Sequence, residues 1–147
     1  MMRSRTRLLV DTNVIIQRRS ADLPVGFLMS AVVLQELAAG ARDSGRLREL
    51  DQLRRAYEQG GMLVVPTGED WWFAGKVLSA LFRGARSHRR GWTSAISKEE
   101  QQRLLRDVLI ARSAKRMNAT VVTHNKRDFA KIQRFCDVAV VEPDEVI

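Results

Sequence analysis

The most informative part of the sequence is LLVDTNVII, residues 8–16. A short apolar run ends at Asp11, two small polar residues follow, and apolar residues then resume. This pattern predicts a buried strand that carries a carboxylate to the edge of a sheet, followed by a helix. Glu36 and Asp107 also lie inside stretches that are otherwise apolar. A charge on an apolar face is costly unless it is paired, and a divalent cation can pair with several carboxylates.

The chain has the length and composition of an ordinary globular domain. Its 147 residues, 45% of them hydrophobic, predict a single domain over residues 1–147. No apolar stretch approaches the roughly 20 residues that span a bilayer, and Asp11 interrupts the apolar run that a signal peptide would need. The single Cys136 cannot form an internal disulfide, which suits a reducing compartment. We therefore expect a cytoplasmic protein without membrane association.

The charge of the chain favours an anionic partner. The net charge is +8, and the segment between Asp70 and Glu99 contains no acidic residue. Basic side chains and an indole ring in this segment could hold phosphates and stack on a base of RNA. An equally open interpretation is a solvated basic loop with its tryptophan folded onto the core. The candidate RNA-binding residues are Arg83, Arg86, Arg89, Arg90 and Trp92.

Strand and helix patterns alternate along the chain. Capping boxes at residues 67–70 and 97–100 mark two helix starts. The predicted strands are residues 7–11, 62–65, 120–123 and 138–141; the predicted helices are a short one from residue 13 and residues 27–40, 43–59, 67–81, 97–117 and 126–135. This order predicts an α/β fold with a mostly parallel sheet.

The predicted fold brings acidic and polar residues together. Parallel sheets bind ligands at the carboxyl ends of their strands. Asp11 ends the first strand, whereas Thr123 and Asn125 follow the strand at 120–123, with Asp128 in the next helical turn. Glu36 and Asp107 share helix faces with residues that we expect to be buried. Converging carboxylates repel one another, and Mg²⁺ or Mn²⁺ would relieve this repulsion.

Four stretches match a known family in order and spacing: residues 10–13, 32–40, 107–111 and 123–129. On these stretches, the chain resembles PIN-domain ribonucleases of the VapC toxin type. The resemblance implies that Asp11, Glu36 and Asp107 bind metal. It also implies that Thr12, Asn13 and Thr123 are supporting polar neighbours.

The resemblance carries further expectations about the whole protein. It implies a Rossmann-like three-layer fold, with four or five mostly parallel strands flanked by helices, and a homodimer. It implies a metal-dependent endoribonuclease that leaves a 5′-phosphate, inhibited by a cognate antitoxin whose tail covers the site. Many relatives carry an acid where this chain has Asn125. Asp128 would then supply the fourth carboxylate, directly or through water, and we expect one firmly bound ion and a second that arrives with the phosphate.

Simpler structural interpretations of these residues stay open. Each acid could cap a helix or form an ordinary ion pair. The candidates are a helix cap formed by Asp11, Thr12 and Asn13, pairing of Glu36 with Arg42, pairing of Asp107 with Arg103 or Arg106, and a cap formed by Asp128. Five further residues are predicted to be core or dimer surface: Trp71, Trp72, Val77, Leu78 and Leu81. At the level of function, the alternatives are a PIN-fold RNA-processing nuclease without an antitoxin and a non-catalytic nucleic-acid-binding regulator.

Overall fold

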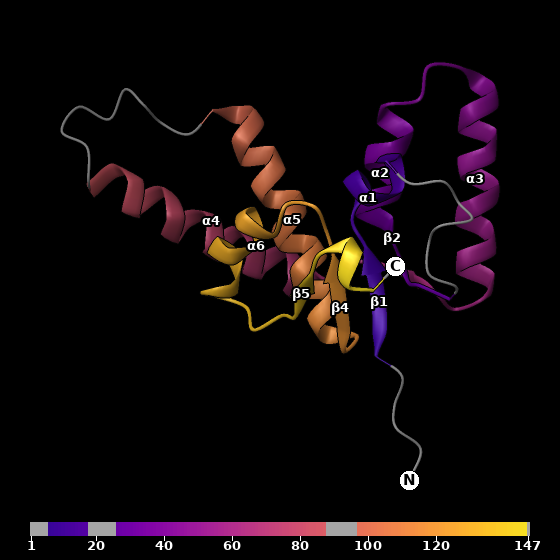
Figure 1. Cartoon of the computed structure of the whole chain (residues 1–147). Coiled ribbons are helices and arrows are strands. Elements are labelled where there is room, and N and C mark those ends of the chain that lie inside the picture. The colour runs from indigo at the N-terminus through magenta and orange to yellow at the C-terminus, as the bar shows by residue number, and fades with distance from the viewer. Residues whose placement is uncertain (1–5, 18–25, 88–96, 147) are drawn as a thin grey trace, which may run out of the picture.

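The computed structural model describes residues 6–17, 26–87 and 97–146, with the backbone alone for residues 17 and 84–87 (Figure 1). Helices and strands alternate along most of the chain. The strands are β1 (Arg7–Val10), β2 (Met29–Ser30), β3 (Leu63–Val64), β4 (Ala119–Val122) and β5 (Val140–Val141). The helices are α1 (Thr12–Gln17), α2 (Ala31–Ala39), α3 (Ser44–Gln59), α4 (Gly68–Ser87), α5 (Lys98–Arg116) and α6 (Lys126–Gln133), followed by a 3₁₀ turn at Pro143–Glu145.

All pairings among the described strands are parallel. β4 lies between β1 and β5, and β2 pairs with β3. A bridge between Leu9 and Leu28 joins the two sets, and the Leu28 N–H donates to the Leu8 carbonyl at 2.7 Å. The strand order is therefore β3-β2-β1-β4-β5. This arrangement confirms the predicted parallel sheet with flanking helices.

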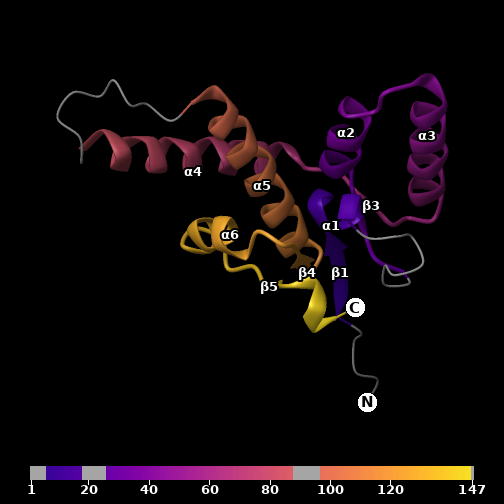
Figure 2. The same cartoon turned by 45° about the horizontal axis from the view of Figure 1, so that its top comes forward.

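The core lies around β4 and α5. Every residue of β4 is buried, as expected for the central strand of a parallel sheet. Helix α5 packs against α4, α6 and β4, and it buries Val108, Leu109 and Ile110 (Figure 2). Helices α2 and α3 lie side by side at one end of the molecule, and α4 and α6 lie toward the other (Figures 1 and 2).

Both predicted capping boxes mark helix starts. The Thr67 N–H donates to Asp70 at 2.9 Å, and the Asp70 N–H donates to the Thr67 hydroxyl at 3.2 Å. Asp70, which is 1% exposed, also forms ion pairs with Arg112 and Arg116, so it fastens the start of α4 to α5. At the second box, the Ser97 hydroxyl accepts from the Glu100 N–H at 3.1 Å. Local capping signals thus correctly located both starts.

The predicted helix over residues 27–40 is wrong in its first part. Residues 29 and 30 form β2, and α2 begins only at Ala31, where the Ser30 hydroxyl caps the helix by accepting from the Val32 N–H at 3.1 Å. Phe27, Leu28 and Met29 are all buried. A short apolar run of this kind fits a buried strand as well as a helix, because periodicity alone does not separate the two.

The tryptophans of α4 do not belong to the core. The buried face of α4 contains Asp70, Ala74 and Val77, at helical spacing. Trp71 and Trp72 lie off this face and are 53% and 73% exposed. Of the two predicted roles, core or dimer surface, only the dimer surface remains possible for Trp71 and Trp72. No described helix is both long and apolar enough to cross a membrane.

Candidate functional site

Asp11 is held between the ends of two neighbouring strands. It directly follows β1, and its N–H donates to the Val122 carbonyl of β4 at 2.9 Å. One carboxylate oxygen accepts from the Thr12 N–H, and the other accepts from the Thr123 hydroxyl, both at 2.8 Å. Burial raises the pKa of Asp11, although these two hydrogen bonds act in the opposite direction. Asp11 thus assists the start of α1, as the capping interpretation expects, and also faces the carboxyl end of β4.

A polar network fixes the surroundings of Asp11. The Thr123 hydroxyl accepts from the Asn125 N–H at 3.0 Å and from the Asn13 amide at 3.4 Å. The side-chain oxygen Oδ1 of Asn13 in turn accepts from the His124 N–H at 3.3 Å. Since the single hydroxyl proton of Thr123 is donated to Asp11, this network sets the direction of the carboxylate.

Glu36 approaches this site from α2. Its side chain is 23% exposed, and it forms an ion pair with Arg106 of α5, with 3.4 Å between Oε1 and Nε. The alternative that Glu36 forms an ion pair holds, but with Arg106, 70 positions away, and not with Arg42. Burial raises the pKa of Glu36, Arg106 lowers it, and the charge of Asp11 raises it again. That last effect means that Glu36 and Asp11 lie within electrostatic reach of each other.

Asp107 lies within electrostatic reach of the other three candidate acids. Burial, together with repulsion from three other carboxylates, raises the pKa of Asp107 to about 8. Those carboxylates are Asp11, Asp128 and Glu36. Arg103 lowers the pKa, but among the described residues no ion pair joins Asp107 to Arg103 or Arg106. The alternative of an ordinary surface ion pair at Asp107 is therefore not what the structure contains.

Asp128 lies on the α6 side of Asp107. Both acids line a hollow of about 200 Å³ between α5 and α6. Asn125 makes no side-chain capping hydrogen bond, and the Asp128 N–H donates to the Asn125 carbonyl at 3.0 Å. Within the described ranges, the Asp128 carboxylate accepts no capping hydrogen bond either, so its oxygens remain available to the hollow.

The donor set fits a hard cation that is bound partly through water. The charge of Asp11 raises the pKa of Glu36, and the charges of both raise the pKa of Asp107. The Thr12 hydroxyl is buried without a well-formed hydrogen bond, although it lies close enough to Glu36 to lower the pKa of that residue. In the part of the chain that the structure describes, no three His, Cys, Asp or Glu side chains lie close enough to hold a metal ion together. Mg²⁺ commonly keeps several water ligands and uses one or two carboxylates, which matches this spacing.

The predicted RNA-binding residues are mostly outside the described part. The described part does not include Arg89, Arg90, Trp92 or the side chain of Arg86. Arg83 is exposed on α4. Sequence reasoning missed the contact between Arg106 and Glu36. The only sequence signal for Arg106 was its position next to Asp107, because nothing in the sequence connects α2 to α5.

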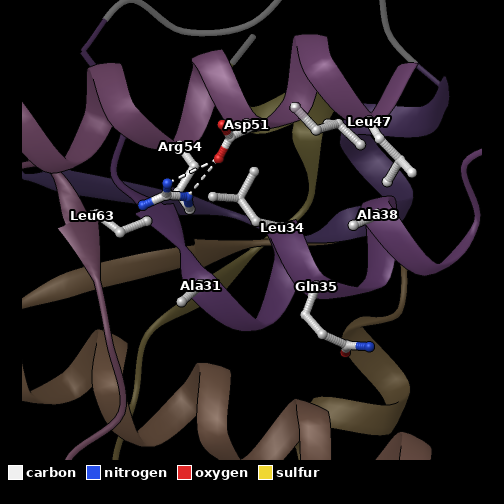
Figure 3. A pocket seen from close by; sticks show the side chains of 9 residues that line it. Ala31, Leu34, Gln35, Ala38, Leu47, Asp51, Arg54 and Leu63 are labelled. Carbon is white, nitrogen blue, oxygen red and sulfur yellow. Dashed lines mark hydrogen bonds and ion pairs between the residues drawn. The ribbon is translucent and has the colours of Figure 1, made fainter. Parts of the chain in front are cut away.

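Two hollows lie on either side of α2 and share Ala31 and Gln35 in their lining. One, of about 370 Å³, lies against α3 and includes Leu34 and Leu47; the ion pair between Asp51 and Arg54 borders it (Figure 3). The other, of about 520 Å³, lies toward α4 and α5, and its lining includes the exposed Trp71 and also Arg106, the partner of Glu36. An apolar surface therefore extends up to the edge of the acidic site.

Solved structures with a similar fold are toxin–antitoxin complexes. VapBC-1 from nontypeable Haemophilus influenzae has a TM-score of 0.57 and 22% identity, covering 95% of this chain and 99% of that one. VapBC2 from Rickettsia felis, bound to promoter DNA, has a TM-score of 0.55 and 16% identity, covering 93% and 98%. FitAcB from Neisseria gonorrhoeae has a TM-score of 0.54 and 21% identity, covering 95% and 99%. At these identities the likeness shows the fold.

Sequence comparison supplies the family. No curated protein matches the chain. A family model described as the PIN domain matches residues 8–135, which include all four acids, strands β2 to β4 and all of β1 except Arg7. From this match, the chain belongs to the PIN domain family.

Proposed function

We propose that this chain is a metal-dependent endoribonuclease and the toxin of a VapBC-type toxin–antitoxin module. PIN domains are generally nucleases and typically use divalent metals. The observation that carries the proposal is that Asp11, Glu36 and Asp107, from three separate parts of the chain, lie within electrostatic reach of one another, with the pKa of Asp107 raised to about 8. Such crowding of acids has no structural benefit, and it is typical of sites that bind cations.

The proposed mechanism assigns metal binding to the acids and positioning to the polar residues around Asp11. Asp11, Asp107 and Glu36 would hold Mg²⁺ or Mn²⁺, with Asp128 contributing through water. The ion would supply Lewis acidity, which activates water for attack on the phosphodiester and offsets the charge that develops there. The Thr12 N–H and the Thr123 hydroxyl fix both oxygens of Asp11, so this carboxylate does not need to reorganise during the reaction. Thr123 is itself oriented by Asn13 and Asn125.

An antitoxin partner is part of the proposal. The similar structures are VapBC and FitAcB complexes, which contain an antitoxin, and this supports such a partner. The apolar hollow that ends at Arg106 offers a surface from which a bound protein segment would reach the acidic site. The exposed Trp71 and Trp72 support a further contact, such as the expected homodimer.

Incubating purified, antitoxin-free protein with total RNA tests the proposed function. In Mg²⁺ or Mn²⁺ we expect discrete fragments that carry 5′-phosphates, and we expect none in EDTA. Tight RNA binding without cleavage by the folded protein would contradict the proposal and favour the non-catalytic regulator. The toxin assignment is tested separately, by co-expression with the product of an adjacent short gene: suppression of cleavage supports it, and the absence of such a partner favours an RNA-processing nuclease.

A further inference from the structure

The hollow between α5 and α6 has a distinctive lining. Its volume is about 200 Å³, and it opens beside Asp107, on the side of α5 that faces α6. Each helix contributes a base with an acid at helical spacing from it: Arg103 and Asp107 from α5, and Lys131 and Asp128 from α6. Helix α5 also contributes a second acid, Glu100, and the apolar Leu104.

The two basic residues of the hollow, Arg103 and Lys131, do not form ion pairs with its acidic residues in the described part of the chain. Arg103 and Lys131 are both exposed. Among the described residues, neither forms an ion pair with Asp107, Asp128 or Glu100. The guanidinium group of Arg103 and the ammonium group of Lys131 therefore remain able to bind another anion, while the stems of these side chains line the hollow.

The charge balance makes anion binding dependent on a cation. The lining contains one more acid than base when all groups are ionised, so the hollow by itself disfavours a phosphate. One divalent cation at Asp107 would reverse this balance. A phosphate would then be attracted both by the ion and by the two bases.

We propose that this hollow is the subsite for an RNA phosphate adjacent to the bond that is cleaved, with Arg103 and Lys131 as the phosphate-binding residues. The inference rests on the proposed function. The size supports a phosphate group rather than a whole small molecule, because sites for the latter usually occupy roughly 300 to 1,000 Å³. Leu104 is the only apolar residue of the lining, which also disfavours an apolar ligand.

The proposal fixes the side on which RNA crosses the site. Glu36 and Arg106 lie on the α2 side of Asp107, where the larger apolar hollow begins. Arg103 and Lys131 lie on the α6 side. RNA bound on the α6 side would leave the α2 side open to a protein partner. The RNA and the partner would then approach each other only at the acidic site.

The test measures binding of a fluorescently labelled single-stranded RNA by anisotropy, in Ca²⁺ and over a series of salt concentrations. All variants keep the four acids, because phosphate binding is proposed to depend on the cation; Ca²⁺ also takes carboxylate oxygens but with a looser geometry than Mg²⁺, so it can fill the site while cleavage is slow. Arg103→Gln and Lys131→Gln are compared with Arg48→Gln, a matched loss of an exposed arginine. Arg48 belongs to α3, which lies far from α6 in both views (Figures 1 and 2). Circular dichroism checks that each variant is folded.

We expect Arg103→Gln and Lys131→Gln to weaken binding several-fold and to reduce the dependence of log K on log salt by about 0.7 each, the value for one lost phosphate contact on a single strand. Arg48→Gln should change neither. The proposal is overturned when Arg103→Gln and Lys131→Gln behave like Arg48→Gln while the wild-type protein cleaves RNA. If the wild-type protein does not cleave RNA but these two residues still control binding, the nuclease proposal fails, and only the assignment of Arg103 and Lys131 as phosphate-binding residues stands.

Discussion

Replacement of Asp11 or Asp107 by asparagine is expected to reduce RNA cleavage by roughly two to four orders of magnitude, the range for loss of a group that activates water or offsets developing charge. Asparagine keeps the shape of the side chain but removes the negative charge that would bind the cation. Initial rates on an RNA substrate in Mg²⁺ measure the effect. Glu49→Gln, at an exposed acid on α3, is the matched control and should retain the wild-type rate.

The two substitutions should differ in their effect on stability. Without a cation, Asp107 is mostly protonated near neutral pH, because its pKa is raised to about 8. Asparagine resembles that neutral form, so Asp107→Asn should fold with an unchanged or higher midpoint of unfolding. Asp11→Asn should lower it slightly, because the new amide N–H₂ group would face the Thr123 hydroxyl, which already donates to Asp11. Cleavage at the wild-type rate by either folded variant would contradict the assignment of that acid.

Replacement of Asp70 by alanine is expected to destabilise the protein by about 3 kcal/mol, at the lower end of the range for breaking a buried ion pair. Asp70 accepts from the Thr67 N–H at 2.9 Å and from Nε and Nη2 of Arg116 at 3.3 and 3.2 Å. Arg112 Nε, which is buried without another hydrogen bond, lies 3.4 Å from its second oxygen. The lower end applies because both arginine side chains are about one-third exposed, at 33% and 37%, and water can partly solvate them.

Urea unfolding measures this change in the free energy of unfolding. Glu69→Ala is the matched control, since Glu69 is an exposed acid in the same helical turn. It should cost only the roughly 0.3 to 1 kcal/mol of a charge near a helix N-terminus. Equal effects of the two substitutions would show that Asp70 does not fasten α4 to α5.

The elements that could be predicted from the sequence are those with local signals. The starts of α4 and α5 follow from their capping boxes, and the meeting of Asp11 with Thr123 follows from the rule that parallel strands share a carboxyl edge. The partner of Glu36 could not be predicted, because it depends on how α2 and α5 pack. The same holds for Arg116, which pairs with an acid 46 positions away.

Strand β2 was missed for a different reason. It contains only two residues and lies within a buried apolar run that continues into α2. Its identity as a strand depends on pairing with β3 and on the bridge from Leu28 to Leu9, which are contacts between distant segments. Local patterns therefore predicted strands β1, β3, β4 and β5 and missed β2.

The most direct test of a shared cation site is a calorimetric titration of EDTA-treated protein with Mn²⁺ in buffers of different ionisation enthalpy. We predict about one ion per chain in the absence of RNA. Binding near pH 7 should release close to one proton, because the ion displaces the proton held by Asp107, whose pKa is about 8. Asp107→Asn should remove this proton release. Absence of saturable binding, or the same proton release from Asp107→Asn, would contradict a cation site built on these acids.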